Sequence, residues 1–227
     1  NSPSRCDSTA LNRTLKILPR VGTMVSGFCW GLREVTGCCL MGHGSAQIEK
    51  GCQNGDVVYY LGRACRLCVK HSVWKRVTLE SDVLHVTLAH DTDGARVKRL
   101  VDDWFVQQAR EELPRYFAEA VERHGWRLRN ARVPLVMRSP DQPQGLRLTV
   151  RPMKSRWGSC SVDGHVTLNA ELVRLPHRLI EYVAVHELCH LVHHNHSAVF
   201  YFQLASCLPD WRQRRAELKT IALEEAR

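Results

Sequence analysis

From about residue 56 onward, the hydrophobic and polar positions follow regular periods along the chain. Four short segments are rich in β-branched and aromatic residues or alternate between apolar and polar residues, which is typical of β-strands. They span residues 57–61, 66–69, 74–79 and 83–88. A polar turn at residues 80–82 separates the last two segments, so we expect them to form an antiparallel hairpin or meander.

A long amphipathic helix is predicted at residues 94–124. Its apolar residues recur three and four positions apart, which places them on one face of a helix. They are Val97, Leu100, Val101, Trp104 and Phe105, followed by Leu113, Tyr116, Phe117, Ala120 and Val121. Pro114 lacks a backbone N–H and its ring clashes with the preceding turn, so we expect it to kink or divide the helix.

The second half of the chain combines short strands with helices. Strand-like segments span residues 133–138, 146–151, 157–161 and 165–169. Three helical segments are expected: one that begins at Pro176, one at residues 198–207 and one at about 210–226. We expect the basic residues of the last helix to form a solvated face; they are Arg212, Arg214, Arg215 and Lys219. The pattern predicts an α+β fold with N-terminal antiparallel strands, a long helix, a small sheet and a final group of helices.

The helix after Pro176 contains the sequence H-E-x-x-H, formed by His186, Glu187 and His190. Residues four positions apart lie one above the other on a helix, so the two imidazoles can turn toward one metal ion. Glu187 lies about 100° further round the helix, within reach of a water bound to that ion. The alternative without a metal site is a surface helix that happens to be rich in histidine. The apolar flanks favour a metal site instead, with His186 and His190 as ligands and Glu187 as general base.

A hydrolytic zinc site usually has three protein ligands. The candidates for the third are His193, His194 and His196. In a continuous helix, His194 would lie about 12 Å along the axis from His186, too far for two bonds of about 2 Å to one ion. His196 avoids this limit if the helix ends near Asn195, a residue that tolerates the left-handed conformation, and if Ser197 caps the next helix. We therefore expect His196 to be the third ligand of one Zn²⁺ per chain.

These motifs resemble the YgjP-like zinc metallopeptidases, a family related to the SprT-like and WLM-type zinc proteases. The resemblance rests on residues 60–63, 154–161, 168–169 and 182–190, and on 195–197 with Phe200. It extends over about residues 56–211 and implies a zincin-like domain that hydrolyses peptide bonds. The chain departs from the family in two places. Cys189 stands where many relatives have alanine, and Tyr201 stands where tryptophan often follows the phenylalanine.

The resemblance implies a peptide or protein substrate. A sheet edge near residues 156–161 could hold an extended peptide as an added strand, with Trp157 and Ser159 lining the cleft. The alternative is that Trp157 and Gly158 serve packing and a turn. Tyr201 is a further candidate for substrate binding.

Some functional questions stay open at this level. Either Tyr182 or Tyr201 could stabilise the oxyanion of the reaction. Two alternative functions also remain: a zinc hydrolase of a non-peptide amide or ester, and a basic module that binds nucleic acid and uses zinc structurally. The sequence does not fix the oligomeric state.

Composition adds a few limits. The chain has 227 residues, 44% of them hydrophobic, and a formal net charge of +9, which permits attraction to nucleic acid without establishing it. No run of about 18 apolar residues occurs, so no membrane span is expected. Ten cysteines at irregular spacings suggest no disulfide framework, which favours a reducing compartment, and we expect a cytoplasmic protein.

Two segments are expected along the chain. Residues 1–45 lack a sustained period and are predicted to be a poorly ordered N-terminal extension. Residues 46–227 are predicted to form the metallopeptidase domain, with its zinc site at residues 186–196. Met41 could serve as a start of translation that leaves this domain intact. We therefore expect residues 1–40 to add little to the fold and nothing to the zinc site.

Overall fold

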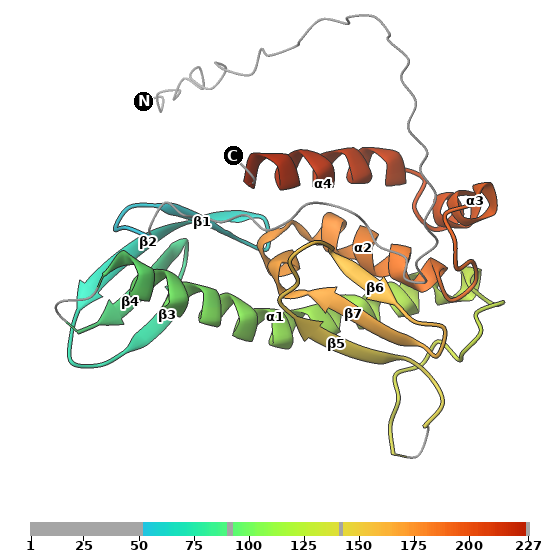
Figure 1. The fold of residues 1–227 in the computed structure, drawn as a ribbon, viewed down its shortest axis with the longest axis horizontal. Helices are drawn as coiled ribbons and strands as arrows, with labels where there is room; N and C mark the ends of the chain where they lie inside the picture. Colours follow the sequence, from blue (N-terminus) through green and yellow to red (C-terminus); the bar gives the residue numbers. More distant parts are fainter. Residues whose placement is uncertain (1–51, 90–92, 141–142, 226–227) are drawn as a thin grey trace, which may run out of the picture. The chain divides into compact units, whose positions relative to one another are not determined.

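A computed structural model describes residues 52–89, 93–140 and 143–225 of the chain, and the expectations for residues 1–45 lie outside these ranges. Helix α1 (Gly94–His124) contacts both sheets and the helix that follows them (Figure 1). Asp93 caps its N-terminus by accepting a hydrogen bond from the Arg96 N–H at 2.9 Å. The helix continues through Pro114, so of the two predicted effects, a kink or a division, the division does not occur. Its buried residues are Val97, Leu100, Val101, Phe105, Ala109, Leu113, Phe117, Ala120 and His124.

The N-terminal sheet has four strands in the order β1-β2-β4-β3. They are β1 (Val57–Tyr60), β2 (Arg63–His71), β3 (Arg76–Glu80) and β4 (Val83–Leu88). β3 and β4 form the expected antiparallel hairpin, but β2 and β4 are parallel, so the prediction of antiparallel strands is wrong for that pair. β4 carries Leu84 and Val86, both fully buried, and takes an inner position that leaves the less buried β3 at the edge.

The β1–β2 hairpin connects this sheet to the second half of the domain. Its two-residue turn, Leu61 and Gly62, has φ values of 49° and 78°, as a hairpin turn of this length requires. The Leu61 N–H donates to the Val173 carbonyl at 2.7 Å, in the short 3₁₀ helix η2 (Ala170–Arg174). A Cβ on Gly62 would lie 2.7 Å from the Pro176 Cβ, so the close approach requires glycine.

The second sheet has three strands in the order β5-β7-β6. β5 (Arg147–Arg151) and β7 (His165–Asn169) are parallel, and the short β6 (Gly158–Cys160) pairs with β7 in the antiparallel direction at the edge. The strand predicted at residues 133–138 is absent from the described structure except for one isolated bridge between Met137 and Leu146. Pro134 lies inside that segment and cannot donate to a ladder, which explains the failure.

The remaining helices are α2 (His177–Cys189), α3 (Ala198–Cys207) and α4 (Trp211–Glu225), with a 3₁₀ turn η1 (Gly125–Arg127) after α1. Residues 179–189 of α2 are all buried, so this helix lies in the core. The predicted span of α3 is confirmed, as is the cap at Ser197, whose hydroxyl accepts from the Phe200 N–H at 3.5 Å.

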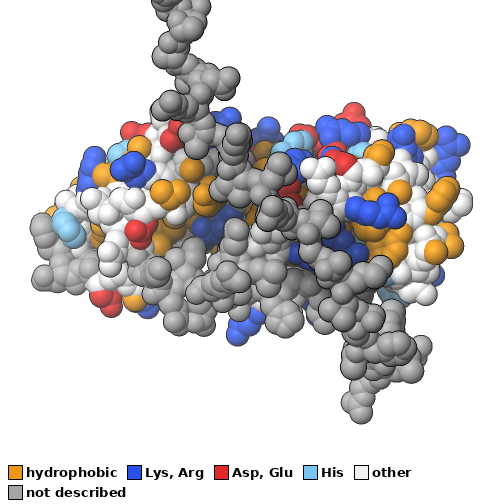
Figure 2. All heavy atoms as spheres, turned by 90° about the horizontal axis from the view of Figure 1, so that it is seen from above, with side chains coloured by type: hydrophobic (Ala, Val, Ile, Leu, Met, Phe, Trp, Pro, Cys, Tyr) orange, Lys and Arg blue, Asp and Glu red, His pale blue; other side chains and the backbone are white. Residues whose placement is uncertain are grey.

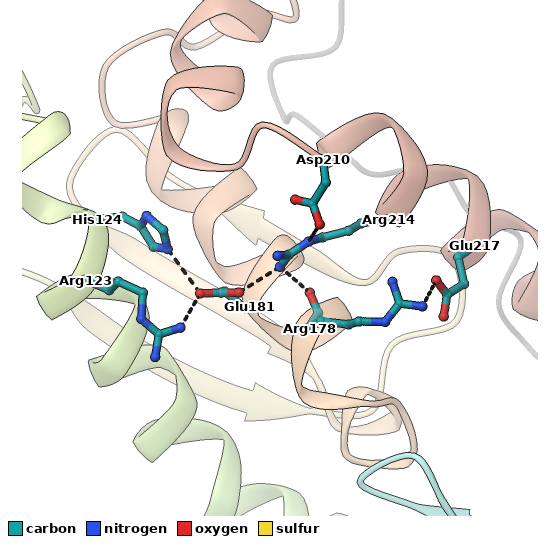
Figure 3. Close-up of polar contacts among 7 residues, drawn as sticks. All are labelled: Arg123, His124, Arg178, Glu181, Asp210, Arg214 and Glu217. Carbon is teal, nitrogen blue, oxygen red and sulfur yellow. Dashed lines mark hydrogen bonds and ion pairs between the residues drawn. The ribbon is translucent and has the colours of Figure 1, made fainter.

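A buried carboxylate, Glu181, joins three helices (Figure 3). It accepts from Arg123 at 2.5 Å and lies 3.1 Å from the His124 ring, both on α1, and it accepts from Arg214 of α4 at 2.7 Å. Arg214 also donates to Asp210 at 2.9 Å. The solvated face predicted for α4 is therefore wrong at Arg214, whose side chain is only 13% exposed. The network positions α2, which carries the H-E-x-x-H sequence, against α1 and α4.

The described surface shows mixed charge. On the face in Figure 2, Lys and Arg side chains are interspersed with acidic and hydrophobic ones. No helix within the described residues has the length and apolar character needed to cross a membrane. The cysteines of the described ranges are free thiols.

Candidate metal centre

Three histidines converge at the C-terminal end of α2. The His186 Nε2 lies 3.2 Å from the His190 Nε2 and 2.9 Å from the His196 Nε2. One ring nitrogen from each of the three lies within 4.8 Å of the others. In a tetrahedral zinc site with bonds of about 2.0–2.1 Å, the nitrogens lie about 3.3–3.4 Å apart. The histidine cluster therefore fits a single ion of this kind.

The end of α2 brings the third histidine back to the other two. The helix ends at Cys189, six residues earlier than the expected end near Asn195, and tight turns follow. The His190 Nδ1 lies 3.0 Å from the His193 carbonyl, which can only accept, so His190 donates from Nδ1. That bond leaves the His190 Nε2 without a proton and available to a metal. Within the described ranges, neither His193 nor His194 belongs to the histidine cluster.

The surroundings of these rings favour their neutral form. His186 and His190 are each 2% exposed, whereas His196 is exposed. Burial lowers the pKa of His190 to about 4 and that of His186 well below its ordinary value. The pKa of His196 is lowered by burial and by the positive charge of Arg215. Neutral imidazole is the form that binds a metal, so the cluster is ready to act as a ligand set.

Glu187 lies fully buried beside the cluster. Neither carboxylate oxygen has a hydrogen-bond partner among the described residues, and burial raises its pKa well above the ordinary value. Gly158 of β6 provides the space for this side chain, because a Cβ there would lie 2.7 Å from the Glu187 Oε1. A buried carboxylate without a hydrogen-bond partner is costly, which makes Glu187 a candidate functional group.

The comparison with known families agrees with this geometry. A family model described as the YgjP-like metallopeptidase domain matches residues 142–221. The matched segment is similar to the metallopeptidase domain of that family. The match confirms the resemblance found in the sequence motifs and indicates a metallopeptidase-type function. It contains the whole histidine cluster, Glu187 and Gly158. No curated protein and no solved structure matches the chain.

Within the matched segment, Asn169 positions the residues that lead into β6. Its side chain accepts from the Met153 N–H at 3.1 Å and donates to the Met153 and Arg156 carbonyls at 2.9 and 3.0 Å. Asn169 is 2% exposed. Its side chain thus replaces the missing ladder bonds of an irregular segment and sets the position of Gly158. The sequence motif contained Asn169 but gave no indication of this role.

The edge of β6 is oriented for pairing. The Asn169 N–H donates to the Trp157 carbonyl at 2.9 Å, and the Ser161 N–H donates to the His165 carbonyl at 3.0 Å. Because hydrogen-bonded positions alternate along an antiparallel pair, the backbone groups of Gly158 point away from β7. Gly158 is itself buried at this edge and lies next to Glu187.

The residues predicted to bind substrate lie in different places. Trp157 is 4% exposed and belongs to the core. It therefore serves packing, and the prediction that it lines a cleft is wrong. Ser159 is partly exposed on β6. Tyr182 is fully buried, with its ring 6.0 Å from that of His186, and burial raises its pKa. Tyr201 is partly exposed, and its ring lies parallel to that of His196 at 6.0 Å.

Arg215 is a site-adjacent residue that sequence reasoning missed. Its guanidinium donates to the Tyr201 hydroxyl at 3.4 Å. The sequence placed Arg215 among the solvated charges of the last helix, but it is partly buried beside the histidine cluster. Only the packing of α4 against the preceding helices brings it there, so periodicity alone contained no signal for it.

Proposed function

We propose that this chain is a zinc-dependent metallopeptidase with a zincin-like fold, which hydrolyses peptide bonds in peptide or protein substrates. The observation that supports this most directly is the convergence of three imidazole Nε2 atoms beside a buried carboxylate without a partner among the described residues. Three histidine ligands with an open fourth position are typical of hydrolytic zinc sites. The YgjP-like match supports peptides as the substrate class.

His186, His190 and His196 would hold the ion through their Nε2 atoms. A bound zinc ion would lower the pKa of a coordinated water and polarise the scissile carbonyl. The hydrogen bond from His190 to the His193 carbonyl fixes the orientation of one ring. Because His196 is the exposed member of the cluster, substrate would approach from its side.

Glu187 would accept a proton from the attacking water and then deliver it to the leaving amine. Its carboxylate has no competing hydrogen bond among the described residues, so both oxygens are available. The neighbouring edge of β6 would hold the substrate backbone as an added strand, which keeps the scissile bond near the carboxylate. Gly158 would serve this arrangement twice, because it leaves room for Glu187 and presents backbone groups at the edge.

The general-base assignment is tested with Glu187→Gln. The variant should keep its zinc and its fold but lose hydrolysis by a factor of about 10² to 10⁴, because glutamine has nearly the same shape and cannot accept the proton. A peptide library and a set of small amides and esters, assayed with both proteins, would identify the substrate class. Wild-type turnover of a confirmed substrate by Glu187→Gln would contradict the assignment. Cleavage restricted to small amides or esters would favour a non-peptide hydrolase.

The ligand assignment is tested by comparing His196→Ala with His194→Ala. His194 lies outside the histidine cluster and provides the matched control. We expect about one Zn²⁺ per wild-type chain, and a zinc affinity lowered by more than about 100-fold in His196→Ala only. Metal analysis after dialysis against a competing chelator measures both. Equal loss in the two variants would show that the third ligand has been misassigned.

A further inference from the structure

Arg215 has no acidic partner within 4.0 Å among the described residues, unlike two other arginines close to α2. Arg214 pairs with Glu181 and Asp210, and Arg178 pairs with Glu217. The contacts of Arg215 are instead with Tyr201: a hydrogen bond of 3.4 Å to its hydroxyl, and 5.8 Å from the guanidinium carbon to its ring centroid. A partly buried guanidinium without a counter-ion is ready to bind an anion.

The position of Arg215 is fixed by a row of parallel rings that begins at the histidine cluster. His196 and Tyr201 are parallel, with centroids 6.0 Å apart and an interplanar angle of 18°. Tyr201 stacks in turn on Trp211, at 4.8 Å and 17°. Trp211 begins α4, so the helix that carries Arg215 is held against the row by its first residue. The guanidinium thus lies at the hydroxyl end of Tyr201.

This side of the centre is also its open side. His186 and His190 are buried, and His196 alone of the three is exposed. The exposed part of the cluster is therefore His196, and Tyr201 lies beside that residue. The Tyr201 hydroxyl already accepts from Arg215, so its own proton remains free to donate. A phenol O–H and a guanidinium together match the two oxygens of a carboxylate.

We propose that Arg215 and Tyr201 form a carboxylate-binding site that selects substrates with a negative charge close to the scissile bond. The carboxylate is either the C-terminal carboxylate of the peptide or the side chain of Asp or Glu. The first source would make the protein a carboxypeptidase, and the second would make it an endopeptidase with acidic preference. This inference rests on the proposed metallopeptidase function and names its substrate class.

The test compares matched substrates with the zinc-loaded full-length protein. A peptide found to be cleaved is synthesised as free acid and as C-terminal amide, and with Glu or Gln next to the scissile bond. The wild type should prefer one charged form by about 10- to 100-fold in kcat/KM, the range expected for a charge-assisted hydrogen-bonded pair. Preference for the free acid identifies the terminal carboxylate, and preference for Glu over Gln identifies a side chain.

The variants show whether Arg215 causes the preference. In Arg215→Gln, kcat/KM should fall by about 10- to 100-fold for the charged substrate and change by less than about 3-fold for the neutral one. Arg215→Lys should recover part of the loss. Tyr201→Phe should lower kcat/KM for the charged substrate less than Arg215→Gln does. Lys219→Gln removes one charge from an exposed position of the same helix and should match the wild type. An equal loss on charged and neutral forms, or no preference in the wild type, would overturn the proposal.

A binding measurement separates this inference from the proposed function. Zinc-loaded Glu187→Gln is titrated with N-acetyl-phenylalanyl-alanine, with its C-terminal amide, and with an N-acetylated dipeptide amide containing Glu or Gln. Tighter binding of a charged probe that disappears with Arg215→Gln supports the carboxylate-binding site even if no peptide is ever hydrolysed. Hydrolysis of neutral peptides combined with equal binding of all probes would retain the peptidase and reject the carboxylate-binding site.

Discussion

Replacing Gly158 by alanine tests the contact between β6 and the proposed general base. A Cβ at this position would lie 2.7 Å from the Oε1, 2.9 Å from the Cγ and 3.0 Å from the Cδ of Glu187. Non-bonded carbon atoms are most stable about 3.5–4.0 Å apart, so the carboxylate must move by roughly 0.5–1 Å. Gly158 has no positive φ, and alanine therefore introduces a steric effect without backbone strain.

A displacement of this size is large for catalysis and moderate for stability. A misplacement of about 1 Å costs about 10²-fold in rate, so kcat/KM should fall by about 10²- to 10³-fold. Overpacking a core site typically lowers the free energy of unfolding by about 1–3 kcal/mol. Zinc content should stay at the wild-type level, because none of the histidines is touched. Kinetics on a confirmed substrate, metal analysis and chemical denaturation measure the three quantities.

Two controls make the result decisive. Gly125→Ala is the same substitution where the nearest atom, the Leu135 Cδ1, lies 3.6 Å away, and it should leave activity unchanged. In the Glu187→Gln background, Gly158→Ala should cause little further loss, because the group through which it acts has already been removed. Wild-type activity in Gly158→Ala, or a full additional loss in the double variant, would refute the reasoning.

Two further predictions concern stability. Glu181→Gln should lower the free energy of unfolding by about 3–5 kcal/mol at neutral pH, because Arg214 loses its buried counter-ion. Removing the more exposed Glu217 should lower it by at most about 1 kcal/mol. The hydrogen bonds from His124, Arg214 and Arg123 lower the pKa of Glu181, so its contribution is complete above the ordinary pKa of 4.5 and is lost as the pH falls below it. Urea unfolding between pH 7 and pH 3 should show the difference shrinking, and a constant difference would contradict this. Asn169→Ala should lower the free energy of unfolding by about 2–3 kcal/mol, and it should lower kcat/KM because Gly158 is displaced. Asn169→Asp should be at least as harmful, because a carboxylate would face two carbonyl oxygens. Wild-type stability and activity in both Asn169 variants would exclude this positioning role.

The features that were predictable from sequence have local causes. The bounds of α1 follow from its apolar spacing, and those of α3 from the cap at Ser197. The approach of His186 and His190, the proposed ligands, needs only one turn of helix. The choice of His196 required the helix to end after that turn. This was inferred from the distance between His186 and His194 along a continuous helix. Each of these inferences depends on residues that are close together in the sequence.

The features that were missed depend on contacts between distant segments. β2 and β4 pair in the parallel direction, although β3 lies between them in the sequence. The periodicity of a single strand does not predict the order of strands in a sheet. Gly158 meets Glu187 only because β6 packs against α2. Arg214 and Arg215 are adjacent in the sequence, yet one pairs with buried Glu181 and the other with Tyr201. A basic helix face provides no means of telling them apart.

Glu181 and Glu187 show how the surroundings assign different roles to the same residue type on one buried helix. Glu181 is surrounded by His124, Arg123 and Arg214, which lower its pKa, so its charge is compensated and contributes to stability. Glu187 has no hydrogen-bond partner among the described residues, and burial raises its pKa against a smaller opposite effect of Arg156, so its charge opposes folding. Removing the charge should therefore have opposite effects: Glu181→Gln should unfold more easily, whereas metal-free Glu187→Gln should be at least as stable as the wild type. A residue that costs stability and lies beside three converging imidazoles fits the general-base role that we propose for Glu187.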